Sequence, residues 1–418
     1  MKLDNYRFEA VKYGLSTLVA QLISFVSVPL ISYFYQPAEY GHFVSFTASA
    51  AILLPFVTLK IESLISISEK SKDVQELKRV AITLTALMSL GISLLIFLVL
   101  IVLKNNILHS LAVSFLLGSI VQVQALSVIL IQVKLKEQSF KKINISGILQ
   151  NSNTLVFQIA FAIVQPSVIS LQLGYISGRM IGLIPLLRKS NKFSVHNYSK
   201  EKFLTKAIVN IFVRSRYFIG ASLVDALLAG IPILLLHKFY GQNFAGYFGM
   251  IQALYLVPVT LISSSFAAIA FSTVTNKDGL VKEERLWHRK QLIRSFAKPI
   301  LCFAVIFLTI SLTLAEPIMG LVISDKWSPM YAVIPAITLS SALNFIWFPF
   351  MNFLNLQGNS QVVFQAALAR LIVGSIFALV AIQFNTSWSG MITIFLVSQL
   401  LFQILGLGAI YVKIFSSK

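Results

Sequence analysis

Long apolar segments are the feature that most limits what this chain can fold into. Of its 418 residues, 57% are hydrophobic and 12% are charged, and the mean hydropathy is +0.82. A run of about 18 or more apolar residues is long enough to cross a bilayer as an α-helix. We therefore predict an all-α polytopic membrane protein with about twelve spanning helices. The expected ranges are 12–34, 42–68, 80–103, 108–133, 143–164, 168–187, 207–236, 245–272, 292–315, 330–356, 362–385 and 388–413.

Basic residues are distributed unevenly between the two ends of these predicted helices. Most of the 34 Lys and Arg fall in the two terminal segments and in alternate loops, whereas the other loops hold Lys104, Lys238 and Lys326. Cytoplasmic loops are enriched in Lys and Arg, so this pattern predicts that both termini are cytoplasmic. It also explains the net charge of +19 without a nucleic-acid partner. The basic loops 188–206 and 273–291 are expected to contact anionic membrane lipids.

The sequence offers little for catalysis or metal binding. Cys302 is the only cysteine, which excludes an internal disulfide and a cysteine-cluster metal site. The five histidines lack metal-ligand spacing, and no Gly-x-x-x-x-Gly-Lys-Ser/Thr phosphate loop is present. We therefore expect a protein that is not an enzyme and has no cofactor. If such a chain moves a cargo across the membrane, the transport would be driven by H⁺ or Na⁺, by the gradient of the cargo, or by downstream consumption of the cargo.

The two halves of the sequence are related. A pattern of Phe-Tyr, then Gly, then Phe occurs twice, 205 residues apart: Phe34-Tyr35, Gly41 and Phe43, then Phe239-Tyr240, Gly246 and Phe248. Each half holds six predicted helices, so we expect a duplication with a cargo site between the halves. The predicted domains are an N-terminal six-helix bundle at 1–190, a basic cytoplasmic linker at 191–206 and a C-terminal six-helix bundle at 207–418.

The segment Tyr33–Phe46, YFYQPAEYGHFVSF, resembles the opening signature of Wzx-type O-antigen flippases. The shared features are an outer turn with Pro-x-x-Tyr-Gly and a following helix with a mid-span proline, here Pro55. The segment Ala245–Thr273, with Pro258, is similar to the equivalent helix in the second half of that family.

The resemblance implies the fold of the multidrug/oligosaccharidyl-lipid/polysaccharide exporter superfamily, in which two six-helix bundles surround a central cavity. The function it implies is to flip an undecaprenyl-diphosphate-linked oligosaccharide from the inner to the outer leaflet of the bacterial inner membrane by alternating access. Membrane lipids, and the polymerase and chain-length regulator of the same pathway, would be partners. Lipid II flippases of this superfamily usually have fourteen helices, which disfavours that identity for a chain with about twelve.

Four cations lie deep in the predicted spans: Arg179, Arg370, Arg214 and Lys60. A charge at such depth costs at least ~2.5–3.5 kcal/mol, so it usually faces a watery cavity or a partner. The predicted topology puts all four in the cytoplasmic half of the membrane, where a diphosphate made on that side would enter. Arginine binds phosphate oxygens bidentately, and we predict that these cations bind the diphosphate. The structural alternative is pairing with a carbonyl or carboxylate, or snorkelling to the interface as expected for Arg216.

Two acids lie at comparable depth, Asp225 and Glu62. Asp225 follows Arg214 by eleven residues and so returns to the same helix face within about 20°. It either compensates nearby arginines or exchanges a proton or sodium ion as a coupling site. Glu62 is the weaker coupling candidate because Lys60 is close in sequence, although the two point to different faces of one predicted helix.

Two other functions fit a chain of this kind. A cation- or proton-coupled multidrug extruder of the same fold exports mostly cationic compounds and should have an acidic cavity, whereas buried cations outnumber buried acids here. A polytopic polysaccharide polymerase or ligase typically uses a sizeable outer loop with arginines, and the predicted outer loops are short.

Overall fold

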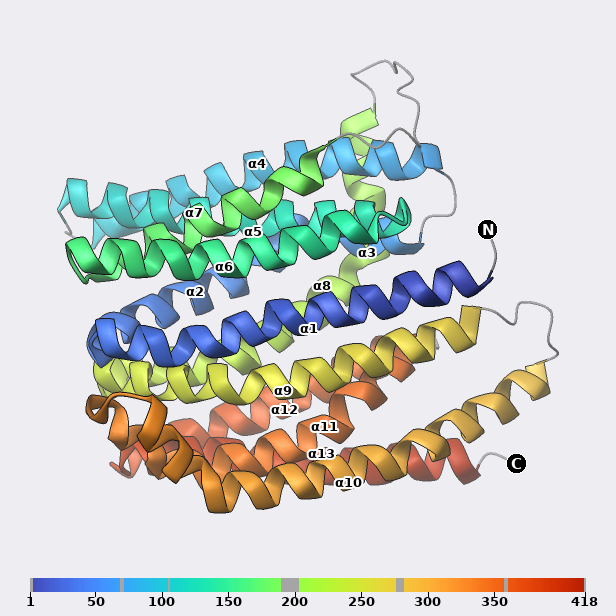
Figure 1. The fold of residues 1–418 in the computed structure, drawn as a ribbon. Helices are drawn as coiled ribbons and strands as arrows, with labels where there is room; N and C mark the ends of the chain where they lie inside the picture. The colour runs from blue at the N-terminus through green and yellow to red at the C-terminus, as the bar shows by residue number, and fades with distance from the viewer. Residues whose placement is uncertain are drawn as a thin grey trace. The chain divides into compact units, whose positions relative to one another are not determined.

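The computed structural model describes the backbone of residues 3–67, 71–103, 106–188, 203–275, 282–356 and 360–416. It places the side chains of residues 19–65, 74–103, 106–188, 218–260, 298–351 and 361–406. Within these ranges every regular element is helical (Figure 1): α1 (Leu3–Phe34), α2 (Pro37–Thr58), α3 (Ile61–Ile67), α4 (Ser71–Val102), α5 (Ile107–Lys136), α6 (Phe140–Val164), α7 (Val168–Leu187), α8 (Phe203–Phe239), α9 (Gln242–Thr275), α10 (Lys282–Val322), η1 (Asp325–Val333), α11 (Ile334–Leu356), α12 (Ser360–Gln383) and α13 (Trp388–Ser416).

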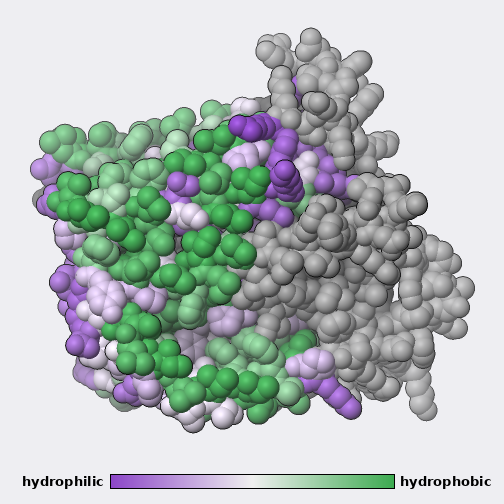
Figure 2. Space-filling view, viewed as in Figure 1, coloured by the Kyte–Doolittle hydropathy of each residue, from purple (hydrophilic) through white to green (hydrophobic). Residues whose placement is uncertain are grey.

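The predicted fold class is confirmed. Each predicted span overlaps one of these helices, and in the described part of the chain ten helices are long and apolar enough to cross a membrane. Apolar side chains cover much of the described surface on the face drawn in Figure 2. On α4, for example, the exposed side chains include Leu87, Leu90, Leu94, Leu95 and Leu98.

One predicted helix, 42–68, is wrong as a single element. Leu59 and Lys60 have φ angles of 45° and 53°, and they separate α2 from α3. This left-handed conformation is costly for a residue with a Cβ atom and ends a right-handed helix. Pro55, one turn before the break, cannot donate a backbone hydrogen bond and weakens the end of α2.

Internal contacts divide the chain into two compact units. Unit 1 comprises Met1–Ser27 and His42–Gly230, and unit 2 comprises Val28–Gly41 and Ile231–Lys418. Helices α1, α2 and α8 therefore contribute residues to both units.

In unit 1, helices α4 to α7 lie side by side, and α6 packs closely along α7 (Figure 1). A tight turn joins α6 to α7: Pro166 cannot continue the first helix, and Ser167 caps the second by accepting a hydrogen bond from the backbone N of Ser170 at 3.2 Å. The core beneath these helices is apolar and includes Val57, Ile120, Val121, Leu130 and Leu186.

A stripe of glycines lets α7 approach α6 closely. Gly174, Gly178 and Gly182 lie one turn apart on α7, and a Cβ atom on any of them would overlap residues of α6. The residues met are Gln158, Thr154 and Gln150, which also lie one turn apart. Small residues at four-residue intervals are a common device for close helix packing in membranes, where apolar burial alone does not drive helix association.

In unit 2, the two turns that carry the repeated sequence pattern pack on each other. A Cβ atom at Gly41 would overlap the carbonyl oxygen of Gln242, and one at Gly246 would overlap the carbonyl oxygen of Pro37. Pro37 and Gln242 are separated by 205 residues, as are Gly41 and Gly246. This reciprocal contact is the arrangement that a duplicated turn gives at a local two-fold axis.

Trp327 packs against the first of these two turns in unit 2. Its ring is fully buried, its Nε1 donates to the carbonyl of Ser32 at 2.9 Å, and Tyr40 packs edge-on at 5.7 Å between ring centroids. Burial, together with the nearby Glu39 carboxylate, raises the pKa of Tyr35 in this turn to about 12. These contacts hold the short segment Val28–Gly41 against the helices of unit 2.

Candidate functional site

Arg179 lies on α7 in unit 1 and is half-buried. Its Nη1 donates to Oε1 of Gln150 at 3.3 Å, and its guanidinium stacks over the ring of Tyr175, 4.8 Å from the centroid. The Tyr175 hydroxyl accepts in turn from Nε2 of Gln124 at 2.9 Å. No carboxylate within the described residues forms an ion pair with Arg179, so its charge is not neutralised by an acid.

Gln150, the partner of Arg179, is itself held in place. It is buried on α6, and its Nε2 donates to Oγ of Ser146 at 3.2 Å and, more weakly, to Oγ of Ser127 at 3.5 Å. Ser146 Oγ donates to the carbonyl of Gly182 at 2.6 Å. The close contact of α6 with α7 therefore fixes the amide that orients the guanidinium.

Arg370 lies on α12 in unit 2 and is only 5% exposed. Its Nη2 donates to Oε1 of Gln399 on α13 at 3.1 Å, and its guanidinium lies 5.1 Å from the ring centroid of Trp347. The Gln403 amide lies 2.7 Å and 3.2 Å from Nη2 and Nη1. Because a guanidinium can only donate, the Gln403 atom that faces it is the carbonyl oxygen.

Lys60 and Glu62 lie at the break between α2 and α3. The helix break brings them together: Lys60 Nζ lies 3.3 Å from Oε1 of Glu62, so the expectation that they point to different faces is wrong. Thr58 Oγ1 accepts from the Lys60 backbone N at 3.2 Å and lies 3.5 Å from the same carboxylate oxygen. Glu62 is 5% exposed, and its Oε2 has no hydrogen-bond partner among the described residues.

Arg214 and Asp225 both belong to the continuous helix α8. The Asp225 side chain is exposed. The side chain of Arg214 lies outside the described residues, as does that of Arg216, so their predicted roles stay predictions. The linker 191–206 also falls largely outside the described part of the chain.

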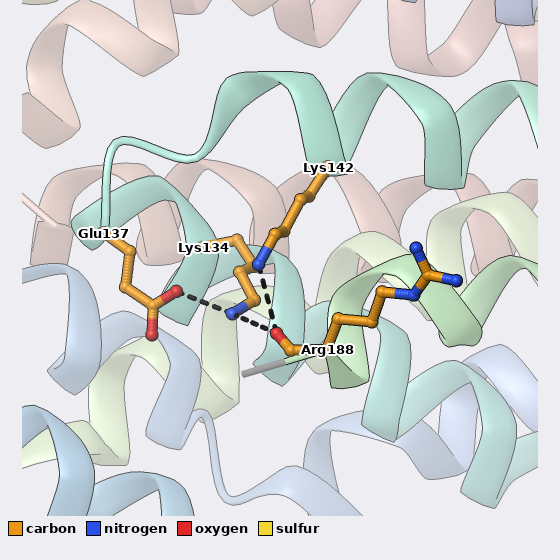
Figure 3. Close-up of polar contacts among 4 residues, drawn as sticks. All are labelled: Lys134, Glu137, Lys142 and Arg188. Carbon is orange, nitrogen blue, oxygen red and sulfur yellow. Dashed lines mark hydrogen bonds and ion pairs between the residues drawn. The ribbon is translucent and has the colours of Figure 1, made fainter. Parts of the chain in front are cut away.

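A further charged cluster joins the ends of α5, α6 and α7 in unit 1 (Figure 3). Lys134 Nζ forms a 2.6 Å ion pair with Glu137, and the two side chains are 2% and 3% exposed. Nζ of Lys134 and Nζ of Lys142 each donate to the backbone carbonyl of Arg188 at 3.2 Å, and the Arg188 side chain points away. Cations at a helix C-terminus satisfy its free carbonyls and oppose its dipole, so this cluster caps α7.

Sequence reasoning did not single out the residues that orient the arginines. Gln399 and Gln403 are two of many amide side chains within the predicted spans, and nothing in the sequence marks Gln150 or Trp347. The predicted span 108–133 ends just before Lys134 and leaves this residue in a loop, whereas Lys134 lies buried in the last turn of α5. An amide on the neighbouring helix at the same depth as each arginine is the signal that would have found the pairs.

Comparisons with known proteins relate the sequence to one protein family and the fold to those of several membrane transporters. The sequence profile of a family described as Polysaccharide biosynthesis protein matches residues 30–332. No curated protein sequence matches the chain. The structure of the lipid II flippase MurJ in an inward closed conformation has a TM-score of 0.70 at 13% identity, covering 96% of this chain and 87% of that one.

Two further solved structures share the fold. A multidrug resistance MATE family transporter of the MOP superfamily, inward-facing, has a TM-score of 0.62 at 12% identity, covering 96% of this chain and 98% of that one. A MOP superfamily transporter from Pyrococcus furiosus, for which a reversed polarity of the binding pocket is described, has a TM-score of 0.62 at 12% identity, covering 97% and 95%. At such low identity the likeness is one of fold.

Proposed function

The chain belongs to the polysaccharide biosynthesis protein family, and from this premise we propose that it flips an undecaprenyl-diphosphate-linked oligosaccharide. It is a multi-pass membrane protein with the fold of flippases and transporters. The activity we propose for it is transport and not catalysis. The proposed cargo is the repeat unit of O-antigen or a related surface polysaccharide. It moves from the cytoplasmic to the outer leaflet of a bacterial inner membrane by alternating access, and both termini are cytoplasmic.

The observation that most supports this proposal is the environment of Arg179. Its partners are an amide oxygen and an aromatic ring, and no acid in the described part of the chain forms an ion pair with it. No acid in the described part of the chain therefore compensates its charge, and it has further N–H donors for a phosphate. A lipid-linked sugar carries its charge in the diphosphate, which is the group such a guanidinium recognises.

The other predicted cations would take part to different degrees. Arg370 is buried among amides and a tryptophan, so it would meet the diphosphate only after the side chains around it rearrange. Lys60 would have to leave Glu62 to bind a phosphate. Arg214 completes the proposed diphosphate-binding set. Membrane lipids, and the polymerase and chain-length regulator of the pathway, are the proposed partners.

The proposal is tested by complementation of a bacterial strain that lacks its own repeat-unit flippase. Arg179→Ala should lower surface polysaccharide at least about tenfold, because a charge-assisted hydrogen bond contributes about 1.5–3 kcal/mol. Lipid-linked repeat units should accumulate on the inner leaflet, which separates a flipping defect from a polymerase or ligase defect.

Arg188→Ala is the matched control for this experiment. Arg188 ends the same helix, is exposed and makes its described contacts through its backbone carbonyl, so the variant should transport normally. Full-length export by Arg179→Ala, at wild-type protein levels, would contradict the proposed role.

A multidrug extruder of the same fold is the second candidate. The likeness to MATE transporters is one of fold, and the Pyrococcus furiosus transporter illustrates that pocket polarity differs within the superfamily. A drug extruder would raise resistance to cationic compounds in a sensitive strain. We expect the present chain to leave that resistance unchanged.

A further inference from the structure

The two arginines described above are held by the same kind of partner at the same spacing along the chain. Arg179 donates to Gln150, and Arg370 donates to Gln399; the residues of each pair are 29 apart in sequence. Each pair joins two consecutive helices that pack along one another, α6 with α7 and α12 with α13. The order differs: in unit 1 the arginine lies on the second helix of the pair, and in unit 2 it lies on the first.

The exchange of the arginine and the glutamine follows the internal repeat. The displacement between the two halves is 205 residues at the turns of Gly41 and Gly246 and 220 residues at these later helices. Helix α6 begins at Phe140 and α12 at Ser360, while α7 begins at Val168 and α13 at Trp388, so both helices are displaced by 220 residues. The same displacement relates Gln150 to Arg370 and Arg179 to Gln399. The two positions therefore correspond between the halves, and the guanidinium and the amide have exchanged places.

A glycine beside each Arg–Gln pair is exchanged between the helices in the same way. It lies on the second helix of the pair in unit 1 and on the first helix in unit 2. On α7, Gly178 allows close approach to Thr154 of α6. The position that corresponds to Thr154 is Gly374 on α12, and a Cβ atom there would lie 3.0 Å from Phe395 and 3.3 Å from Nε2 of Gln399 on α13. In both units the helix that carries the arginine also carries the glycine, so each guanidinium lies beside a close helix contact.

We infer that each half of the chain carries one guanidinium that binds phosphate, Arg179 or Arg370, at corresponding positions of a helix pair. Gln150 positions the first guanidinium and Gln399 positions the second. Either helix of the pair can supply the arginine, provided that the other supplies the glutamine. The inference rests on the proposed function and extends it to these two glutamines. An amide oxygen holds the guanidinium in one direction without removing its charge, whereas a carboxylate would compete with the phosphate. The free energy of phosphate binding then depends on the charge between the helices and not on which helix supplies it.

An exchange of the two residues tests the inference. We would compare Arg179→Gln, Gln150→Arg and the double variant Arg179→Gln/Gln150→Arg, each in the complementation assay and as purified protein in nanodiscs. Binding of undecaprenyl diphosphate would be measured by native mass spectrometry, with undecaprenol as the uncharged control. Arg179→Gln should reduce transport and diphosphate binding at least about tenfold. The double variant should recover both to within about threefold of the wild type.

The outcomes separate this inference from the proposed function. If the double variant reaches wild-type levels in the membrane and melts normally, but transports no better than Arg179→Gln, the inference is wrong and the proposed function stands. If Arg179→Gln itself transports and binds diphosphate normally, the inference and the proposed role of Arg179 are wrong. If the wild-type chain does not restore surface polysaccharide, the proposed function is wrong. If the double variant does not accumulate, Arg370→Gln/Gln399→Arg makes the same exchange in unit 2, and its recovery relative to Arg370→Gln decides the matter in the same way.

Discussion

At the scale of single residues, the cations described above differ in how they are compensated. Lys60, which is partly exposed, and Lys134, which is buried, are paired with carboxylates, whereas Arg179 and Arg370 are bound by amide oxygens and stack on aromatic rings. A paired charge contributes mainly to the fold, because its removal leaves the partner buried and uncompensated. A charge oriented by an amide can still attract an anion.

Removal of Lys134 should therefore destabilise the protein. In Lys134→Met the Glu137 carboxylate stays buried without its cation, and we expect the free energy of unfolding to fall by roughly 3–5 kcal/mol. Lys142→Met is the matched control, because Lys142 donates to the same Arg188 carbonyl from a less buried position. Its expected loss is at most about 1 kcal/mol. Thermal unfolding of the two purified variants would be compared, and equal melting temperatures would rule out the buried pair as the cause.

At the scale of helices, the contact between α6 and α7 is what makes the Arg179 site possible. The glycine stripe brings the helix backbones close together, and this closeness allows Ser146 to reach the Gly182 carbonyl and Gln150 to reach Arg179. The Arg179 site thus depends on the glycines of α7, which have no side chain that could contact a ligand.

Gly178→Ala should disturb this contact. The added methyl group would overlap the Thr154 backbone, which cannot move aside as a side chain can, so a loss of about 1–3 kcal/mol in the free energy of unfolding is expected. Gly91→Ala on α4 is the matched control, since nothing lies within 4 Å of its Cβ position, and alanine is the better helix former. We expect Gly91→Ala to be neutral or slightly stabilising. A Gly178→Ala protein with wild-type melting temperature and transport would show that the helices can separate without loss.

At the scale of the whole chain, the duplication remains visible in three dimensions. The repeated turns at Gly41 and Gly246 contact one another reciprocally, and the Arg–Gln pairs occur at corresponding positions in the two halves. Helices α1, α2 and α8 each belong to both units. The proposed transport by alternating access, and the proposed ion coupling, would involve both units of the chain.

Asp225 is the residue we propose for coupling to H⁺ or Na⁺, with Glu62 as the weaker candidate. The Asp225 carboxylate is exposed on α8 and lies in the stretch Phe218–Phe239, which is long and apolar enough to cross a membrane. A carboxylate within a membrane span can exchange a proton or bind a sodium ion. Asp225→Asn should abolish the dependence of transport on an imposed pH or sodium gradient, measured in vesicles with a lipid-linked substrate. Asp325→Asn, an exposed acid in the first turn of η1, should leave that dependence intact. An unchanged gradient dependence in Asp225→Asn would remove the coupling role.

Much of the fold could be predicted from the sequence because membrane insertion depends on local hydropathy. A span needs a sufficient run of apolar residues, so the positions of the helices follow from the chain itself, as does the turn at Pro166. The deeply placed cations were also visible, because a charge inside an apolar run stands out at once.

Only the tertiary structure decided what those cations contact. The break at Leu59 and Lys60 brings Lys60 to Glu62, and the pairing of Arg179 with Gln150 depends on how two helices pack side by side. Such contacts depend on the rotation and separation of neighbouring helices, which hydropathy does not encode. The sequence by itself therefore determined a polytopic membrane protein with cations deep in its spans, and the structure decided which of the described charges pair with an acid and which are oriented by an amide.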